Sequence, residues 1–458
     1  MRVLLLNPPG SQVYIRDYFC SKTTKSNYLF HPIDLVALSG TLAERHDVAV
    51  LEAIAERLSP AAAHARIETF RPDVVVALVG SVSWPEDREF LAEVHRRGRR
   101  VLAIGDVLQE ESEQRLADEQ WIEAALHDFT NADVVAYLDG DRESVAEMTL
   151  RHGDGRVERI RKGPRHGGYR IPRPRHELFP SRGYRFSFAR REPFATVLTD
   201  YGCPYPCTFC VIGTLGFKTR PIEDVLEEID ALRARGIREI FFLDQTFGLS
   251  LERALAMCAA FAERGDLSWT AFTRPDTARP ELLAAMVRAG CHTIILGVES
   301  ADDAQLAAYK KGYRTAEVRA ATAAARRAGL RTVGTFVIGL PEDTEASLRA
   351  SLDFAIELEL DFMSLNMAVP RFGTPFRRRA LESGLARAED LVMDQGGARA
   401  FLPTASLSRE RMLELKKEMI RGFYLRPRWI ARRLAKTRNA GELVRQVREG
   451  AALLARNV

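Results

Sequence analysis

Between residues 195 and 370, short apolar runs alternate with longer stretches in which apolar residues recur every three or four positions. This alternation predicts repeated β/α units and a parallel sheet. Glycine or proline marks the ends of most helical stretches. Six such units predict a partial β/α barrel. Strands are expected at residues 195–199, 239–243, 268–273, 293–296, 332–338 and 362–368, and helices at 221–235, 254–264, 280–289, 315–328 and 345–358.

A second series of the same kind precedes the barrel. It predicts an open, doubly wound parallel sheet, in which ligands bind at the carboxyl ends of the strands. Strands are expected at residues 2–7, 48–51, 73–79, 100–104 and 134–138, with helices at 31–44, 61–69 and 86–97. The whole chain is predicted to be α/β, with a Rossmann-like domain at 1–150, a linker at 151–192, the barrel at 193–380 and a helical basic segment at 381–458.

Composition narrows the class of protein. A hydrophobic content of 46% with 28% charged residues is typical of a globular protein, and no apolar run is long enough to span a membrane. We therefore expect a cytoplasmic location. Residues 408–458 carry 14 lysines and arginines against 5 glutamates. Such a tail either lies on an anionic membrane surface or docks on the barrel. Basic residues are concentrated only in this tail, which gives nucleic-acid binding little support.

Three of the six cysteines stand within eight residues. Cys203, Cys207 and Cys210 form a C-x3-C-x2-C run directly after the first barrel strand. A structural zinc site would need a fourth ligand at finger-like spacing, and a disulfide framework would need an oxidising compartment, for which no signal peptide is present. Three thiolates can instead hold three irons of a [4Fe–4S] cluster and leave the fourth iron open to a small molecule.

This run, with an aromatic residue before its last cysteine, resembles the signature of the radical S-adenosylmethionine (radical SAM) enzymes. The resemblance implies that the three cysteines ligate the cluster and that Tyr205 and Phe209 contact the cofactors. It also implies that S-adenosylmethionine binds the open iron and yields a 5′-deoxyadenosyl radical. An external electron donor, such as a flavodoxin or a ferredoxin, is then required.

Polar residues collect at the carboxyl ends of the predicted barrel strands, where this fold places its sites. Asp244 and Arg274 are candidates for catalytic roles, with a salt bridge at the barrel mouth as the alternative. The family resemblance adds a Gly-Val-Glu-Ser segment and a variant of the G-x-I-x-G-x-x-E motif, which imply contacts with S-adenosylmethionine. The residues concerned are Glu299, Ser300, Thr335 (in place of the first glycine of the motif), Val337, Gly339 and Glu342.

The first 150 residues resemble the cobalamin-binding domain that precedes the barrel in many radical SAM enzymes. The resemblance implies cobalamin contacts at the strand ends marked by Pro8, Ser81 and Gly105. An Asp-x-His-x-x-Gly motif is missing, and Asp106 stands where a second glycine is usual, so the alternative is a sheet that serves only as scaffold. The aromatic and basic loop at residues 11–30 is expected to cover the space between the domains or to pack as a surface loop.

The function predicted from these features is cobalamin-dependent methylation of an unactivated carbon in an apolar, lipid-like or natural-product small molecule. Two alternatives remain open at this stage. One is a cobalamin-independent rearrangement, carbon–carbon coupling or cyclisation by the same radical. The other is a non-catalytic iron–sulfur protein, which the motifs at Glu299 and Glu342 disfavour.

Overall fold

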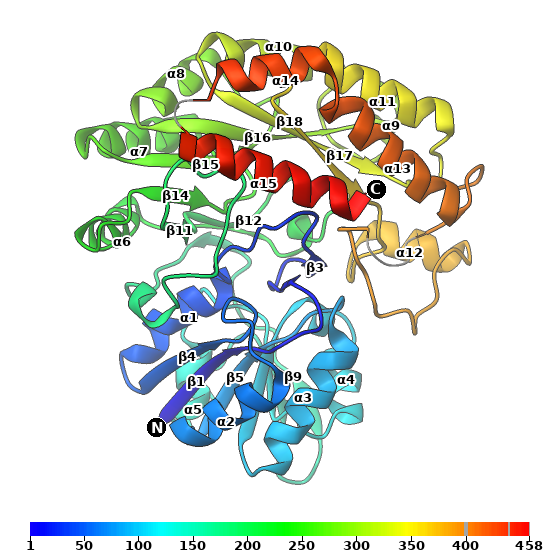
Figure 1. The fold of residues 1–458 in the computed structure, drawn as a ribbon. Coiled ribbons are helices and arrows are strands. Elements are labelled where there is room, and N and C mark those ends of the chain that lie inside the picture. Colours follow the sequence, from blue (N-terminus) through cyan, green and yellow to red (C-terminus); the bar gives the residue numbers. More distant parts are fainter. Residues whose placement is uncertain (398–401, 438–439, 458) are drawn as a thin grey trace.

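The computed structural model describes residues 1–397, 402–437 and 440–457, and Figure 1 shows two bodies, each built on a large sheet. The N-terminal body is a seven-stranded sheet in the order β4-β1-β5-β6-β7-β8-β9. From β4 to β7 all neighbouring strands are parallel, which confirms the doubly wound sheet. Its strands are β1 (Arg2–Asn7), β4 (Asp47–Glu52), β5 (Val74–Leu78), β6 (Arg100–Ile104), β7 (Ala124–Leu126), β8 (Met148–Arg151) and β9 (Val157–Arg159).

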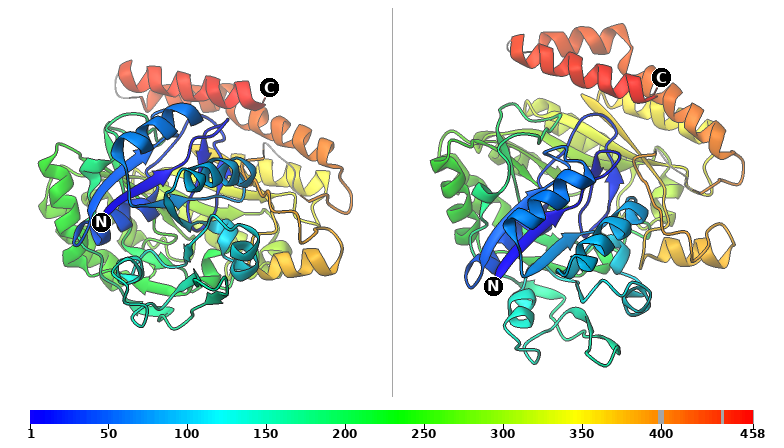
Figure 2. Two further views of the ribbon diagram at one scale, coloured as in Figure 1. Left: turned by 90° about the horizontal axis from the view of Figure 1, so that it is seen from below. Right: turned by 60° about the horizontal axis from the view of Figure 1, so that its bottom comes forward.

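Helices pack on the faces of this sheet (Figures 1 and 2). Strand β5 is buried along its whole length because helices cover both faces, which explains its continuous run of valines. The N-terminal helices are α1 (Ile33–Ala43), α2 (Pro60–Phe70), α3 (Trp84–Arg96), α4 (Ser112–Asp118) and α5 (Asp133–Leu138).

Two features of this body differ from the sequence prediction. The strand predicted at residues 134–138 is wrong, because Asp133–Leu138 forms helix α5 and β7 takes the place in the sheet. The sheet also continues past residue 150, since β8 and β9 add two antiparallel strands to its edge. Part of the predicted linker therefore belongs to the N-terminal sheet.

The second body confirms the partial barrel. Its six-stranded sheet runs β11-β14-β15-β16-β17-β18 with every pair parallel, and β11 and β18 are its two edges. The strands are β11 (Phe194–Val197), β14 (Glu239–Phe242), β15 (Ser268–Thr273), β16 (Cys291–Glu299), β17 (Arg331–Ile338) and β18 (Phe362–Met367). Helices cover its outer face (Figure 1): α6 (Ile222–Ala234), α7 (Leu251–Glu263), α8 (Pro280–Arg288), α10 (Thr315–Arg327) and α11 (Glu345–Glu357). Two shorter helices, α9 (Asp303–Ala308) and α12 (Pro375–Glu382), follow β16 and β18.

Residues 11–30 lie between the two bodies, as Figure 1 shows for strand β3. They contain a small hairpin of β2 (Tyr14–Ile15) and β3 (Lys22–Thr23). On one side Ser21 Oγ donates to Asp106 Oδ2 at 2.8 Å, and on the other Thr23 Oγ1 donates to Asp394 Oδ2 at 2.7 Å. The expectation that this loop covers the interdomain space is confirmed.

Three helices end the chain: α13 (Arg409–Tyr424), α14 (Pro427–Ala435) and α15 (Ala440–Asn457). Helix α14 docks on the barrel, because the indole of Trp429 donates to the Asp361 carbonyl at 3.0 Å and Arg432 donates to the Leu360 carbonyl at 2.7 Å. The docked alternative is the one the structure shows, and nothing in it supports the membrane-surface alternative. Within the described part of the chain, no helix has the length and apolarity to cross a bilayer.

Candidate functional site at the barrel mouth

The cysteine run lies at the carboxyl end of β11, between β12 (Asp200–Gly202) and β13 (Phe217–Thr219). These strands form a small sheet with β10 (His166–Gly168). The Cys203 amide donates to the Gly216 carbonyl at 3.0 Å, and the Cys210 amide donates to the Cys207 carbonyl at 3.1 Å. A β-carbon at Gly213 would lie 2.5 Å from the Tyr205 carbonyl oxygen. The loop is therefore a tight, defined structure that holds its thiols in place.

All three cysteines are free thiols in largely apolar surroundings. Burial, and after it the neighbouring Cys207, raises the pKa of the Cys210 thiol to about 12. A metal that binds here must therefore displace protons. Among the described residues, no three His, Cys, Asp or Glu side chains converge as a single metal ion requires. The argument for a cluster thus depends on the cysteine spacing and on the charges around the thiols.

Two cations lie beside the thiols. Arg274 Nη1 is 3.9 Å from Cys207 Sγ, and its guanidinium lies 3.5 Å from the centre of the Tyr205 ring. Burial opposes the charge of Lys311, but the Glu299 carboxylate outweighs it and holds the Lys311 pKa well above its usual value. Both groups stay cationic at neutral pH, as a site for an anionic cluster requires.

The side chains of the two candidate catalytic residues, Asp244 and Arg274, are bound to other residues of the barrel. Asp244 Oδ1 accepts from the amides of Thr199 and Asp200 at 2.6 and 3.0 Å, and its carboxylate is completely buried. Arg274 forms an ion pair with Asp276 at 2.9 Å and donates to the Lys311 carbonyl at 2.5 Å. Asp244 thus braces the segment that leads into the cysteine loop, and Arg274 links Asp276 to the Lys311 carbonyl.

Glu299 has an unusual backbone that turns its side chain toward this loop. The register of β16 against β17 shifts between Gly297 and Glu299, and Glu299 itself has a φ of 66°. A bulge and a left-handed glutamate are both costly and are characteristic of functional sites. The Glu299 carboxylate forms an ion pair with Lys311 at 3.0 Å. A small cavity at this point is lined by Phe209, Glu299, Ser300, Gln305, Leu306, Tyr309, Lys311 and Leu340.

The residues of the predicted second motif lie on the wall next to this cavity. Val337 belongs to an apolar cluster with Tyr309 and Leu340, against which Phe209 packs. The Tyr309 hydroxyl donates to Glu342 Oε2 at 2.6 Å. Gly339 has a φ of 83°, a left-handed conformation that favours glycine. Thr335, two residues before Val337 on β17, donates to the Leu296 carbonyl at 3.2 Å.

Sequence reasoning missed three side chains of this site: Tyr309, Lys311 and Tyr313. They follow helix α9, away from any strand end, so a search of strand termini does not reach them. The Lys311 ammonium lies 5.3 Å from the centre of the Phe209 ring and 5.5 Å from that of Tyr313. The alternation of aromatic and basic residues at 309–313 was the one signal available in the sequence.

The carboxyl edge of the N-terminal sheet is filled by the chain itself. Ser81 Oγ donates to Asp106 Oδ2 at 2.9 Å and is 3.0 Å from Ser21 Oγ. Arg16 Nη1 donates to the Pro8 carbonyl at 2.9 Å. A β-carbon at Gly105 would lie 1.7 Å from the Val79 carbonyl oxygen. Pro8, Ser81 and Gly105 thus lie at one edge, as predicted, but residues 11–30 cover it.

Comparison with known proteins identifies the barrel. Residues 197–355 match the Radical SAM superfamily. The chain contains a Radical SAM domain and is an enzyme. An uncharacterized methyltransferase of Pyrococcus horikoshii is 29% identical to it over 445 residues, which are 93% of this chain and 93% of that protein.

Two solved structures share the fold of nearly the whole chain. The radical S-adenosylmethionine methyltransferase TsrM of Kitasatospora setae, with cobalamin and a [4Fe–4S] cluster bound, has a TM-score of 0.70 at 17% identity and covers 93% of this chain and 89% of its own. The cobalamin-dependent enzyme OxsB, with aqua-cobalamin and S-adenosylmethionine bound, has a TM-score of 0.68 at 15% identity, covering 97% and 70%. At these identities the likeness establishes the fold.

The cofactors of radical SAM enzymes, a [4Fe–4S] cluster and S-adenosylmethionine, fit the residues of the barrel mouth. Three uncommitted thiols lie beside two buried cations, and the cavity at Glu299 offers a carboxylate, an ammonium and aromatic rings. TsrM and OxsB hold cobalamin, and at the N-terminal edge of this chain Ser21 and Arg16 bind Asp106 and the Pro8 carbonyl, so a corrinoid bound there would lie against residues 11–30.

Proposed function

We propose that this radical SAM enzyme transfers a methyl group from one S-adenosylmethionine, by way of cobalamin, to an unactivated carbon of an apolar small molecule. A second S-adenosylmethionine would yield the 5′-deoxyadenosyl radical that removes the hydrogen from that carbon. The observation that carries the proposal is the convergence of the three thiols with the Glu299–Lys311 ion pair at the barrel mouth. The methyltransferase name of the relative that matches along 93% of both chains supports methyl transfer. A radical is needed because no protein side chain is basic enough to deprotonate a plain C–H bond.

In this proposal Cys203, Cys207 and Cys210 hold the cluster. When bound, the cluster supplies the electron that opens a carbon–sulfur bond of S-adenosylmethionine. Lys311 keeps its charge and balances the anionic groups that meet at the thiols. Glu299 accepts hydrogen bonds from the ribose or the ammonium of the nucleotide.

The remaining residues of the barrel mouth shape the site. Phe209 and Tyr309 line it with apolar surface that excludes water. Thr335, Val337, Gly339 and Glu342 form the wall on which the adenine packs. Asp244 and Arg274 act as positioning residues, because their polar atoms are bound to the segment that carries the cysteines.

The first test replaces one cluster ligand. Cys207→Ala is expected to reduce bound iron sharply and to abolish cleavage of S-adenosylmethionine, measured anaerobically with flavodoxin or dithionite as the electron donor. Cys258→Ala is the matched control, since Cys258 is also buried but lies on helix α7. Full iron content and turnover in Cys207→Ala would refute the assignment of the site.

A second candidate function follows from the covered N-terminal edge. If residues 11–30 stay in place, no corrinoid binds, and the same radical rearranges, couples or cyclises the substrate. Methyl transfer leaves S-adenosylhomocysteine beside 5′-deoxyadenosine, whereas the alternative leaves 5′-deoxyadenosine alone. Chromatography of the nucleosides, together with the cobalamin retained by protein reconstituted with hydroxocobalamin, separates the two functions.

A further inference from the structure

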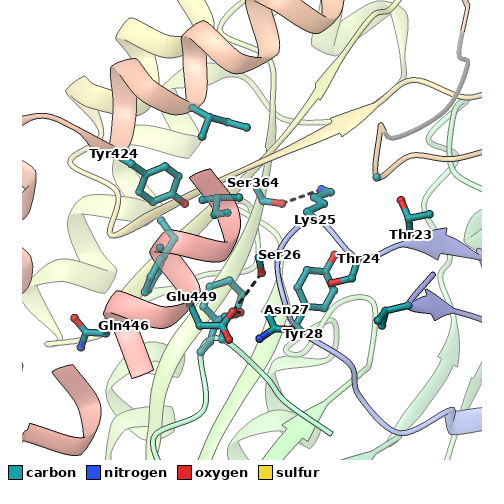
Figure 3. Close-up of a pocket in the computed structure, with 18 of the residues that line it drawn as sticks. Thr23, Thr24, Lys25, Ser26, Asn27, Tyr28, Ser364, Tyr424, Gln446 and Glu449 are labelled. Atoms are coloured by element: carbon teal, nitrogen blue, oxygen red, sulfur yellow. Dashed lines mark hydrogen bonds between the residues drawn. The ribbon is translucent and has the colours of Figure 1, made fainter. Parts of the chain in front are cut away.

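A large cavity lies apart from the cysteine loop, on the open side of the barrel. Its volume is about 990 Å³, at the upper end of the range for small-molecule sites. Its walls come from residues 10–13, 23–28 and 53–58, from the edge strand β18 and from helices α13, α14 and α15 (Figure 3). None of the residues assigned above to the cluster or to S-adenosylmethionine lines it.

The C-terminal helices close this cavity by bridging the two edges of the barrel sheet. Glu449 on α15 accepts from Ser187 Oγ at 2.9 Å, shortly before β11, and from Ser26 Oγ at 3.3 Å. The Tyr424 hydroxyl on α13 donates to the Met363 carbonyl on β18 at 2.8 Å. The helical segment thus encloses the cavity as well as docking on the barrel.

Most of the helical wall is apolar. Several of these side chains are large hydrophobic groups with substantial exposure, such as Leu425 at 52% and Leu434 at 53%. Exposed apolar surface of this extent is uncommon unless it meets a ligand or a partner. The apolar wall comprises Ile420, Leu425, Trp429, Ile430, Leu434 and Val447.

The opposite end of the cavity is basic. Lys25 donates to Ser364 Oγ at 3.1 Å and to Asn366 Oδ1 at 2.5 Å, and Figure 3 shows it turned toward Ser364. Lys416 is only 6% exposed and donates to the Gly396 carbonyl at 2.7 Å. The carboxylate whose charge acts on both ammonium groups is that of Asp394, which also accepts from the Thr23 hydroxyl. Burial lowers the pKa of both lysines, that of Lys416 to about 8, so an anion bound between them would stabilise their charged forms. One carboxylate for two lysines leaves this end of the cavity suited to receive an anion.

We propose that this cavity binds the substrate, and that the substrate is an amphiphile with an anionic head group and a long apolar body. This inference rests on the proposed function. The carboxylate or phosphate head binds between Lys25 and Lys416, and the apolar body lies along α14 and α15.

The position of Lys25 relates the head group to the chemistry. Its partners Ser364 and Asn366 pair in register with Thr335 and Val337, the predicted wall of the nucleotide site. The carbon that reacts is therefore close to the head group, and the far end of the body lies toward the C-terminal helices.

The test uses cis-parinaric acid, a fluorescent fatty acid, with energy transfer from Trp429 in the cavity wall as the signal. The acid is expected to bind saturably and at least about tenfold more tightly than its uncharged methyl ester. A fluorescent alkyl phosphate then distinguishes a phosphate head from a carboxylate head. Equal binding of acid and ester would overturn the anionic head group.

Variants locate the binding. Lys25→Met with Lys416→Met is expected to lower the affinity for the acid to that for the ester, whereas the exposed Lys162→Met is expected to change neither. Gly450→Trp fills the cavity, because a β-carbon at Gly450 meets no atom within 4 Å and this glycine lines the space. It is expected to abolish probe binding. The control Gly153→Trp adds the same ring at an exposed glycine with equal room, outside the cavity.

Two outcomes refute the assignment without touching the proposed chemistry. One is probe binding that survives Gly450→Trp in protein whose circular dichroism and melting curve match the wild type. The other is displacement of the probe by hydroxocobalamin, which would show that the cavity binds a corrinoid and not the proposed substrate. Conversely, Cys207→Ala is expected to bind the probe normally, so failure of the radical chemistry and failure of the cavity are measured separately.

Discussion

The barrel mouth and the carboxyl edge of the N-terminal sheet both lie where parallel strands end, but only the N-terminal edge is covered by residues 11–30. Parallel sheets present loops and polar groups at the carboxyl ends of their strands, and ligands bind there. At the barrel mouth the thiols remain uncommitted beside Arg274 and Lys311. At the N-terminal edge, Asp106 and Asp87 are saturated by Ser21 and Arg16.

This difference shows that strand topology predicts where a ligand can bind, but not whether other residues of the chain already cover that site. Whether the N-terminal edge is covered depends on the loop at residues 11–30, some of whose partners come from distant parts of the chain. Substitutions that disturb each place should therefore have different consequences: a loss of stability at the filled edge and a loss of ligand binding at the mouth.

The largest effect is expected at the filled edge. Arg16 is 1% exposed, and its ion pair with Asp87 at 2.6 Å has no access to water. Arg16→Ala leaves a buried carboxylate without its partner, which should lower the free energy of unfolding by about 3–5 kcal/mol in urea titrations. Arg96→Ala, which removes a surface ion pair, should cost at most about 1 kcal/mol. If the two variants were equally stable, the edge would not be the packed network described above.

At the mouth, the expected loss is in ligand affinity. Lys311→Met removes the ammonium that pairs with Glu299, and affinity for S-adenosylmethionine should fall about 10- to 100-fold, or roughly 1.4–2.8 kcal/mol by calorimetry. The adjacent Lys310→Met is the control, because Lys310 is exposed. Unchanged affinity in Lys311→Met would mean that the nucleotide binds elsewhere.

The smallest effect is expected for Ser21→Ala. Ser21 Oγ bonds Asp106 and lies against Ser81, so its loss should cost about 1 kcal/mol of stability. If residues 11–30 occupy the position of a corrinoid, the same variant should bind hydroxocobalamin more tightly than the wild type, as followed by its absorbance spectrum. A loss of stability without any gain in cobalamin binding would favour the scaffold interpretation of the sheet.

Both sheets could be predicted from the sequence because their strands are long apolar runs with glycine and proline between them. Residues 134–138 were mistaken for a strand because a run of five apolar residues has no reliable period. Its burial is helical: Val134, Tyr137 and Leu138 are buried while Val135 and Ala136 are half-buried.

The three cysteines proposed as cluster ligands could be recognised in the sequence, because three cysteines in eight residues form a local pattern. Lys311 was not, since its link to Glu299 crosses helix α9 and depends on the bulge in β16. The place of residues 11–30 was predicted only in outline. Their partners Ser364 and Asp394 lie more than 300 positions away, beyond the reach of any periodicity.

The hydrogen bond from the Thr23 amide to Asp394 spans 371 positions of the chain. During synthesis the N-terminal sheet leaves the ribosome first, while the segment that will anchor its covering loop has not yet been translated. Contacts between such distant residues form late, because closing so long a loop is entropically costly. The nascent sheet can therefore hold residues 11–30 only through contacts within its own body, such as Arg16 with Asp87 and Ser21 with Asp106, until the anchor on Asp394 forms.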